Sequence, residues 1–191
     1  KRRDNADIVK HMYGGVIDIL VNKQNVNMSI KFLKDEMMKL LDGKFSMDML
    51  VITKSLRGYY KNPQQIAHKV LADRIGIRDP GNKPSSNDRI PYIYIQTKGK
   101  PKLQGDRIET PDFIRENELK PDYMFYITNQ IMKPVQQVFA LILEQIPEYK
   151  RKVRQLNIRI ESLKEKYKDK KRDDKIDDLK NKEVKKLIFD D

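Results

Sequence analysis

Groups that could carry out enzymatic chemistry are sparse in this sequence. Its only two histidines, His11 and His68, lie far apart and outside any metal-binding spacing such as HExxH, so ordinary helix-surface positions are expected for both. The acidic pairs at 173–174 and 177–178 alternate with lysines at helical spacing, which favours a solvated helix face over a metal site. No GxxxxGKS/T, GxGxxG or GxSxG motif occurs. We therefore predict no catalytic residue, no metal ligand and no cofactor in this chain.

The turn-rich stretch RDPGNKPSSNDRIPY, which begins at Arg78, is better suited to binding an anion. Its turn-forming residues present backbone N–H groups, and Arg78, Lys83 and Arg89 place positive charge around them. Asp79 and Asp88 stand beside the arginines and are expected to orient their guanidinium groups. The composition fits equally well a phosphate-binding loop and an exposed connector held by local ion pairs.

The charge of the chain favours an anionic partner. Its 191 residues include 40 Lys and Arg against 28 Asp and Glu, a net charge of +12. Residues 51–108, which contain the loop, hold 12 basic and 4 acidic side chains. Clustered cations bind phosphates with higher affinity because binding releases counterions. Nucleic acid or an anionic membrane surface is therefore the expected partner.

The cellular compartment can be predicted only broadly. The absence of cysteine excludes disulfides and thiolate zinc sites and is compatible with a reducing compartment. No apolar run approaches the ~20 residues of a membrane span, and no signal peptide is apparent. We expect a soluble intracellular protein.

Hydrophobic periodicity predicts two helices near the start of the chain. The first covers residues 5–22. The second covers residues 28–42, with Asn27 as its N-cap and Gly43 as its C-terminal stop. A short buried strand is expected at 50–53.

The middle of the chain predicts a third helix beside a strand. Asn62 is placed to cap this helix, Pro63 suits its first position, and Gly76 should end it. IPYIYIQT, residues 90–97, alternates as a strand does, and the glycines and prolines that follow favour a turn or hairpin.

The remaining elements are expected to be helical. Thr110 and Pro111 should open a short helix, and residues 121–146 should form one or two apolar helices bent near Pro134. Beyond Pro147, a heptad seam predicts a long exposed helix, followed by a hinge and a second helix that ends near Leu187 and folds back. The seam consists of Val153, Leu156, Ile160, Leu163 and Tyr167.

Five segments in a fixed order carry a resemblance to a known family. They are RRDN at 2–5, LVITKSL at 50–56, IAHKVLADRIGIRDPGNKP at 66–84, NDRIPYIYI at 87–95 and ITNQIMKPVQQVF at 127–139. In this order they resemble the C-terminal part of family B DNA polymerases of the delta type, both eukaryotic and from large DNA viruses. The matched region resembles the thumb, with residues 1–5 at its junction with the palm.

The resemblance implies a predominantly helical α+β fold with a small strand-containing subregion. Residues 1–147 would be the thumb-like domain and residues 148–191 a charged helical C-terminal extension. In that family the thumb grips the primer–template duplex behind the active site, through phosphates and the nearly degenerate minor groove.

The resemblance also implies which residues meet DNA. Direct contacts are expected from Arg2, Arg3, Thr53, Lys54, Lys69, Arg74, Arg78, Lys83 and Arg89. Structural support of the DNA site is expected from Asp4, Asn5, Asp79, Gly81, Asp88 and Tyr92. Tyr92 could pack beneath the loop or touch a sugar of the DNA, and burial beneath the loop is expected.

The family's YGDTDS-type motif, whose carboxylates hold two Mg²⁺ ions in the palm, does not occur in this sequence. We therefore expect this chain to be inactive alone, and Mg²⁺ to be bound by the palm of a parent polymerase. A charged tail in place of the cysteine-rich modules of eukaryotic delta-type enzymes favours a viral enzyme, acting in the nucleus or at a viral replication site in the host cytoplasm.

The expected partners are primer–template duplex DNA, the palm and fingers of the parent, and a possible protein partner for the C-terminal helix, but no membrane. The alternative from another functional class is a non-catalytic basic adaptor whose heptad tail binds a protein.

Overall fold

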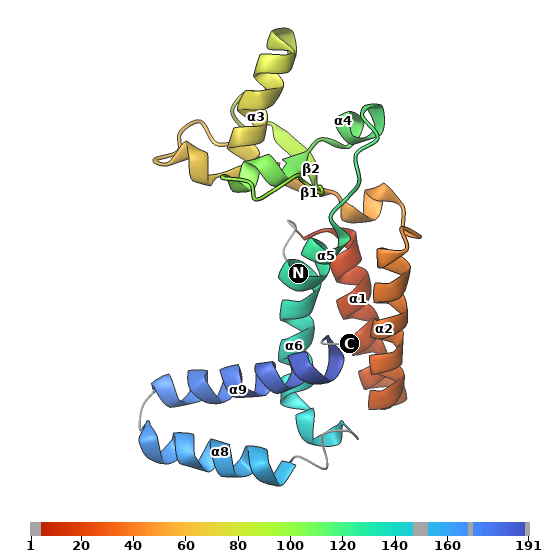
Figure 1. Cartoon of the computed structure of the whole chain (residues 1–191), viewed down its shortest axis with the longest axis vertical. Helices are drawn as coiled ribbons and strands as arrows, with labels where there is room; N and C mark the ends of the chain where they lie inside the picture. The colour runs from red at the N-terminus through yellow and green to blue at the C-terminus, as the bar shows by residue number, and fades with distance from the viewer. Residues whose placement is uncertain (1–4, 147–152, 168–169, 190–191) are drawn as a thin grey trace. The chain divides into compact units, whose positions relative to one another are not determined.

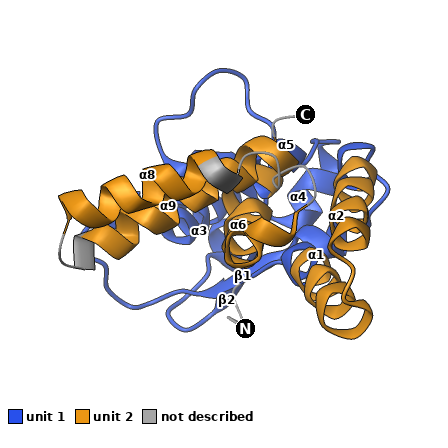
Figure 2. Ribbon diagram, turned by 90° about the horizontal axis from the view of Figure 1, so that it is seen from below, with its two compact units in different colours: residues 1–10, 40–126 blue, residues 11–39, 127–191 orange. Residues whose placement is uncertain are grey.

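The computed structural model describes residues 5–146, 153–167 and 170–189 (Figure 1). The chain forms two compact units, residues 1–10 with 40–126 and residues 11–39 with 127–191, which Figure 2 shows in different colours. Helices dominate, and one small antiparallel sheet accompanies them. The predicted fold class, predominantly helical α+β, is therefore confirmed.

A three-stranded antiparallel sheet forms the centre of the first unit. Its strands, in the order β1-β2-β3, are Ile52–Ser55, Arg89–Tyr94 and Ile108–Glu109. The strand expected at 50–53 begins two residues later, because a 3₁₀ turn, η2 (Met47–Leu50), precedes it. The expected hairpin is present, since β3 returns antiparallel to β2.

The register of the strands decides which side chains share a face. Ser55 pairs with Arg89 and Ile52 pairs with Tyr92. Because side chains alternate along a strand, Arg89 lies on the face of Thr53 and Ser55, whereas Lys54 lies on the opposite face, that of Ile52 and Tyr92.

Helix α3 (Ala67–Arg78) packs against the sheet and buries Leu71 and Ala72. The expected cap at Asn62 is wrong: its side chain makes no capping hydrogen bond, and Pro63 opens a separate 3₁₀ turn, η3 (Pro63–Gln65). The expected stop at Gly76 is also wrong, because the helix continues for two more residues. Gly76 instead leaves room for a neighbour, since a Cβ there would lie 2.7 Å from Cγ of Lys83.

Aromatic side chains cover the Tyr92 face of the sheet. Tyr94 stacks on Phe125 with ring centroids 4.1 Å apart, and Tyr126 of α5 (Tyr123–Tyr126) meets Tyr94 edge to face at 5.8 Å. The Tyr126 hydroxyl donates to the Leu50 carbonyl at 2.6 Å and accepts from the Tyr94 backbone N–H at 3.1 Å. Burial raises the pKa of Tyr126, so its phenol stays protonated and keeps donating.

Helix α4 (Pro111–Glu116) begins as its sequence predicts. The Thr110 hydroxyl accepts from the Phe113 backbone N–H at 3.3 Å, and Pro111 occupies the first turn.

The second unit is helical. It contains most of α1 (Asp7–Asp18), the π-helical η1 (Ile19–Lys23), nearly all of α2 (Val26–Leu41) and α6 (Met132–Leu141), followed by η7 (Leu143–Gln145). The predicted helices are confirmed, but the cap of α2 is Asn25, whose side chain accepts from the Met28 N–H, and not Asn27. Gly43, with φ of 70°, follows α2 as expected. The bend predicted near Pro134 stays a prediction: Pro134 lies in the first turn of α6, and a π-helical turn, η6 (Ile127–Ile131), directly precedes this helix.

The charged C-terminal region forms two helices, α8 (Val153–Lys166) and α9 (Lys170–Ile188), and α9 packs against both α8 and α6. Leu156, Val184 and Ile188 are buried, and Arg159 pairs with Glu183 at 3.6 Å. The predicted second helix that folds back on the first is thus confirmed. Among the described residues, no helix has the length and apolar character that crossing a membrane requires.

One buried carboxylate ties α1 to α2 within the second unit. Glu36 bonds to His11 Nε2 at 2.8 Å and to Lys39 Nζ at 2.9 Å. Burial alone would raise the pKa of Glu36, but these two hydrogen bonds outweigh it and lower the pKa below its usual value of 4.5.

Replacing Glu36 with Gln should therefore lower the free energy of unfolding by about 1 kcal/mol near neutral pH. Because the folded-state pKa is depressed, this stabilisation is present above pH 4.5 and is lost as the pH falls through the folded-state pKa. Urea denaturation of both forms between pH 3 and 7 would measure it. The exposed Glu144, changed to Gln, is the control; a pH-independent difference would contradict the assignment.

Candidate nucleic-acid interface

The loop between α3 and β2 has a defined backbone. A 3₁₀ turn, η4 (Pro80–Asn82), opens it, and two backbone hydrogen bonds close it, from Asn87 N–H to Leu56 O at 2.7 Å and from Leu56 N–H to Asp88 O at 2.8 Å. Asn87 adopts a left-handed conformation with φ of 72°. The turn residues therefore build a shaped loop rather than a loose connector.

The two aspartates of this loop do not orient the arginines, and that expectation is wrong. Asp88 Oδ2 accepts from the Ser85 N–H at 2.9 Å, and Asp79 Oδ2 accepts from the Asn82 side chain at 2.6 Å. Both carboxylates are used within the loop, as is common for Asp in turns.

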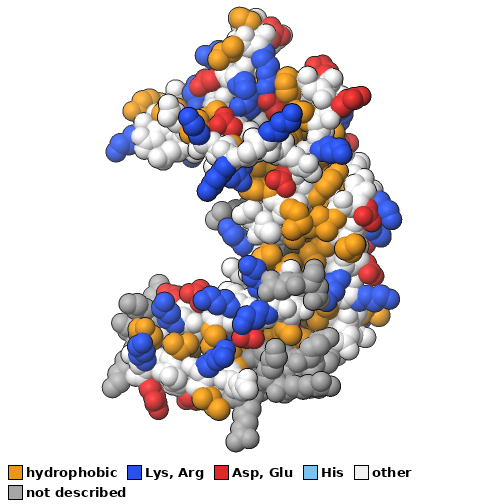
Figure 3. Space-filling view, in the orientation of Figure 1, with side chains coloured by type: hydrophobic (Ala, Val, Ile, Leu, Met, Phe, Trp, Pro, Cys, Tyr) orange, Lys and Arg blue, Asp and Glu red, His pale blue; other side chains and the backbone are white. Residues whose placement is uncertain are grey.

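Two cations and the loop line a cavity of about 490 Å³, which we call the cationic pocket. Lys83 and Arg89 supply its charge, and its other lining residues are Ile75, Gly81, Asn82, Pro84, Asp88, Ile90, Pro91 and Thr110. Among the described residues no carboxylate pairs with Lys83 or Arg89. Arg89 donates only long hydrogen bonds, to Ser55 Oγ at 3.3 Å and Thr53 O at 3.5 Å. Figure 3 shows Lys and Arg side chains at many places on the face of the molecule that it draws.

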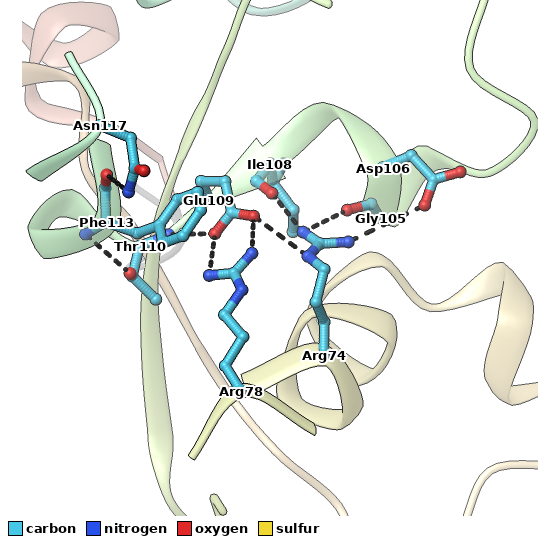
Figure 4. Close-up of polar contacts among 9 residues, drawn as sticks. All are labelled: Arg74, Arg78, Gly105, Asp106, Ile108, Glu109, Thr110, Phe113 and Asn117. Carbon is cyan, nitrogen blue, oxygen red and sulfur yellow. Dashed lines mark hydrogen bonds and ion pairs between the residues drawn. The ribbon is translucent and has the colours of Figure 1, made fainter. Parts of the chain in front are cut away.

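Arg74 and Arg78 instead both bind one buried carboxylate, that of Glu109, and Arg74 also pairs with Asp106 at 3.8 Å (Figure 4). Glu109, whose side chain is 6% exposed, accepts from Arg74 Nε at 3.1 Å and from both terminal nitrogens of Arg78, one of them at 3.0 Å. Arg74 also donates to the Gly105 and Ile108 carbonyls, at 3.0 and 2.6 Å.

Glu109, Arg74 and Arg78 together form what we call the Glu109 cluster. It fixes α3 to β3 beside the cationic pocket. The Arg78 guanidinium also lies over the Phe113 ring, 3.6 Å from its centroid. Glu109 directly precedes Thr110, which lines the pocket. The three cations predicted for the loop, Arg78, Lys83 and Arg89, therefore lie in one region of the unit.

The other predicted site residues are only partly brought together. Thr53 lies on the Arg89 face of the sheet, whereas Lys54 lies on the opposite face. Lys69 pairs with Asp73 at 2.9 Å along α3. Tyr92 is 2% exposed, which confirms its expected burial.

Of the four site residues predicted at the start of the chain, the structure describes only Asn5. Asn5 is exposed and precedes α1. The predicted residues Arg2, Arg3 and Asp4 lie outside the described residues.

Two features of the site are absent from the sequence-based prediction. Glu109 was missed, although an acidic residue within a short apolar strand pattern was a usable signal. The segment RGYYK at 57–61 was also missed, although cations that alternate with aromatic residues are typical of nucleic-acid-binding surfaces. In the parts of the chain that the structure describes, no three His, Asp or Glu side chains lie close enough to hold a metal ion.

Comparison with known proteins places the chain in a family. Residues 1–142 match DNA polymerase family B. The chain is 55% identical to the DNA polymerase of Pyramimonas orientalis virus over 198 aligned residues, which cover all of this chain and 16% of that protein. It is 46% identical to the DNA polymerase of Acanthamoeba polyphaga mimivirus, over 75% of this chain and 9% of that protein.

A cellular DNA polymerase and a solved DNA polymerase structure also match this chain. The DNA polymerase delta catalytic subunit of Candida albicans is 32% identical over 74% of this chain and 13% of its own length. The family B DNA polymerase of the archaeon Pyrobaculum calidifontis shares the fold, with a TM-score of 0.56 at 20% identity over 69% of this chain and 17% of that one. This chain thus spans a sixth or less of the length of these curated relatives, and it belongs to DNA polymerase family B.

Proposed function

We propose that this chain is the thumb of a template-directed, replicative DNA polymerase and that it grips the primer–template duplex. The observation that carries the proposal is the cationic pocket, in which two cations without carboxylate partners flank a shaped loop. Phosphates are the same at every base pair, so such a site can hold DNA of any sequence. Family membership favours this function over that of a free-standing adaptor.

The contacts fall into three groups. Lys83 and Arg89 are proposed as the principal phosphate ligands, with the Thr53 hydroxyl on the same face as Arg89. Arg74 and Arg78 are proposed to act through Glu109, by holding α3 and the loop in place, and Asp79, Gly81 and Asp88 shape the loop. Further contacts are proposed for the cations Lys54, Lys69, Arg2 and Arg3, with Asp4 and Asn5 as support at the palm junction.

Catalysis is proposed to reside elsewhere in the polymerase. Two Mg²⁺ ions held by palm carboxylates would stabilise the charge that develops during phosphoryl transfer, and this chain alone would not catalyse it. We propose that the palm and fingers are its neighbours and that it acts inside cells, where the genome is replicated.

Residues 148–191 are proposed to be an extension added to the thumb, with a protein partner as their ligand. The family match ends at residue 142, whereas the Pyramimonas orientalis virus relative aligns over the whole chain. An extension shared with that viral relative supports a viral origin of the polymerase.

Changing Lys83 and Arg89 together to Ala should weaken binding of blunt duplex DNA about tenfold at moderate salt. Since each phosphate contact contributes ~0.9 to the slope of log affinity against log salt, the slope should fall by ~1.8. Fluorescence anisotropy with a labelled duplex at several salt concentrations measures both quantities.

The matched control is the pair Lys44→Ala and Lys120→Ala, which removes the same charge from exposed positions of the same unit. Equal slopes for the two double variants would contradict the proposal, because the effect would then come from total charge alone. In the complete polymerase, the Lys83 and Arg89 change should shorten each synthesis run more than it slows addition of a single nucleotide.

A further inference from the structure

The loop that follows β1 presents an aromatic ring to solvent between two cations. Tyr59 is 81% exposed, and Arg57 and Lys61 on either side of it are exposed as well. Neither cation has a carboxylate partner among the described residues. An exposed ring with flanking cations offers both a stacking surface and phosphate ligands.

This loop is held in place by its second tyrosine. The Tyr60 hydroxyl accepts from the Arg57 backbone N–H at 2.8 Å and bonds to His68 Nε2 of α3 at 3.0 Å. The Tyr60 and His68 rings also meet edge to face, with centroids 5.9 Å apart. Tyr60 thus anchors the loop to α3, while Tyr59 remains in solvent.

The loop continues the surface of the cationic pocket. Leu56, which directly precedes this segment, forms two backbone hydrogen bonds with Asn87 and Asp88 of the loop between α3 and β2. A Cβ on Gly58 would lie only 3.2 Å from Ser86 Oγ, so the two loops pack directly against each other. A nucleic acid bound at Lys83 and Arg89 would therefore pass close to residues 57–61.

We propose that Tyr59, Arg57 and Lys61 bind an unpaired stretch of nucleic acid, with the Tyr59 ring stacked on a base and the two cations on the adjacent phosphates. This inference rests on the proposed function, because it extends the path of the duplex held at the cationic pocket. Unpaired nucleic acid is the fitting ligand because only an unpaired base exposes the π-face that a tyrosine ring can cover, whereas duplex DNA presents mainly sugars and phosphates.

The test uses the 191-residue chain and two labelled probes, a single-stranded oligonucleotide and a blunt duplex of the same length. Tyr59→Ala should weaken single-strand binding about 5- to 150-fold, the range that corresponds to the loss of one stacked base at ~1–3 kcal/mol. Binding of the blunt duplex should change less than twofold. Tyr59→Phe, which keeps the ring, should bind the single strand as tightly as the unsubstituted chain does.

The control is Ile77→Ala, since Ile77 is an 82% exposed apolar side chain of the same unit. Unchanged single-strand binding by Tyr59→Ala would overturn the inference, as would an equal loss on both probes or a Tyr59→Phe variant as weak as the alanine variant. Failure of the unsubstituted chain to bind the blunt duplex would instead contradict the proposed function. The comparison of single-strand binding between the variants would still decide the role of Tyr59.

Discussion

Replacing Glu109 with Ala is expected to lower the free energy of unfolding of the sheet-containing unit by about 3 kcal/mol. The carboxylate is almost fully buried and binds two guanidinium groups, those of Arg74 and Arg78. Its removal leaves two like charges close together, and of the two arginines only Arg74 keeps another carboxylate nearby, that of Asp106 at 3.8 Å. The side chains of Arg74 and Arg78 are 26% and 30% exposed, so water offsets part of the cost, and the effect should lie at the lower end of the range for a broken buried pair.

Urea denaturation followed by far-ultraviolet circular dichroism would measure this loss, and amide hydrogen exchange in α3 and β3 would locate it. Glu116→Ala is the matched control, because Glu116 is exposed on α4 of the same unit and should change the stability by less than ~0.5 kcal/mol. Equal stability of the two variants would show that the Glu109 cluster does not hold α3 to β3. Arg74 and Arg78 would then be available to bind phosphate directly.

The elements of this fold were predictable where the determining interactions are local. Apolar spacing located the helices, and Thr110 and Pro111 marked the start of α4 because a cap and the helix it opens lie within four residues. The same local logic failed at Gly76. There the glycine accommodates Lys83, a neighbour that only the folded loop brings into contact.

The candidate site was predictable in composition but not in pairing. Asp79 and Asp88 are the nearest acids to the loop arginines in sequence, yet the partner of Arg78 is Glu109, which lies 31 residues away. The pairing of β3 with β2 places Glu109 on the face that α3 covers, and such a contact has no local signature. Alternation along β1 separates Thr53 from Lys54, because neighbouring residues of a strand point to opposite faces of the sheet.

Cationic side chains of one basic segment lie in two different environments. Arg74 and Arg78 neutralise a buried carboxylate and make a rigid support, whereas no carboxylate of the described residues pairs with Arg89 or Lys83, which we propose to bind an external anion. A net charge alone could not have distinguished them. For the proposed binding of DNA of any sequence, a rigid support would matter because each phosphate contact adds affinity only when its geometry is already in place.

Tyr126→Phe should cost about 3 kcal/mol of unfolding free energy even though the ring is kept. The change leaves the Leu50 carbonyl and the Tyr94 N–H without their partner in the interior, and each unsatisfied buried group costs ~1–3 kcal/mol. Tyr59→Phe removes an exposed hydroxyl and is the control, with an expected change below ~0.5 kcal/mol. Thermal and urea denaturation of both variants at neutral pH would measure the difference.

The advantage of Tyr126 over Phe should also depend on pH. The folded-state pKa of Tyr126 lies above the unfolded value of 10.0, so its stabilising contribution is fully present below pH 10 and is lost as the pH rises further. Between pH 6 and 9 the two proteins should therefore differ by a constant amount, and above pH 10 the difference should shrink, because only the chain with Tyr126 gains stability in its unfolded form by ionising that phenol. A difference that grows above pH 10 would mean that Tyr126 does not donate its proton to Leu50 inside the folded unit.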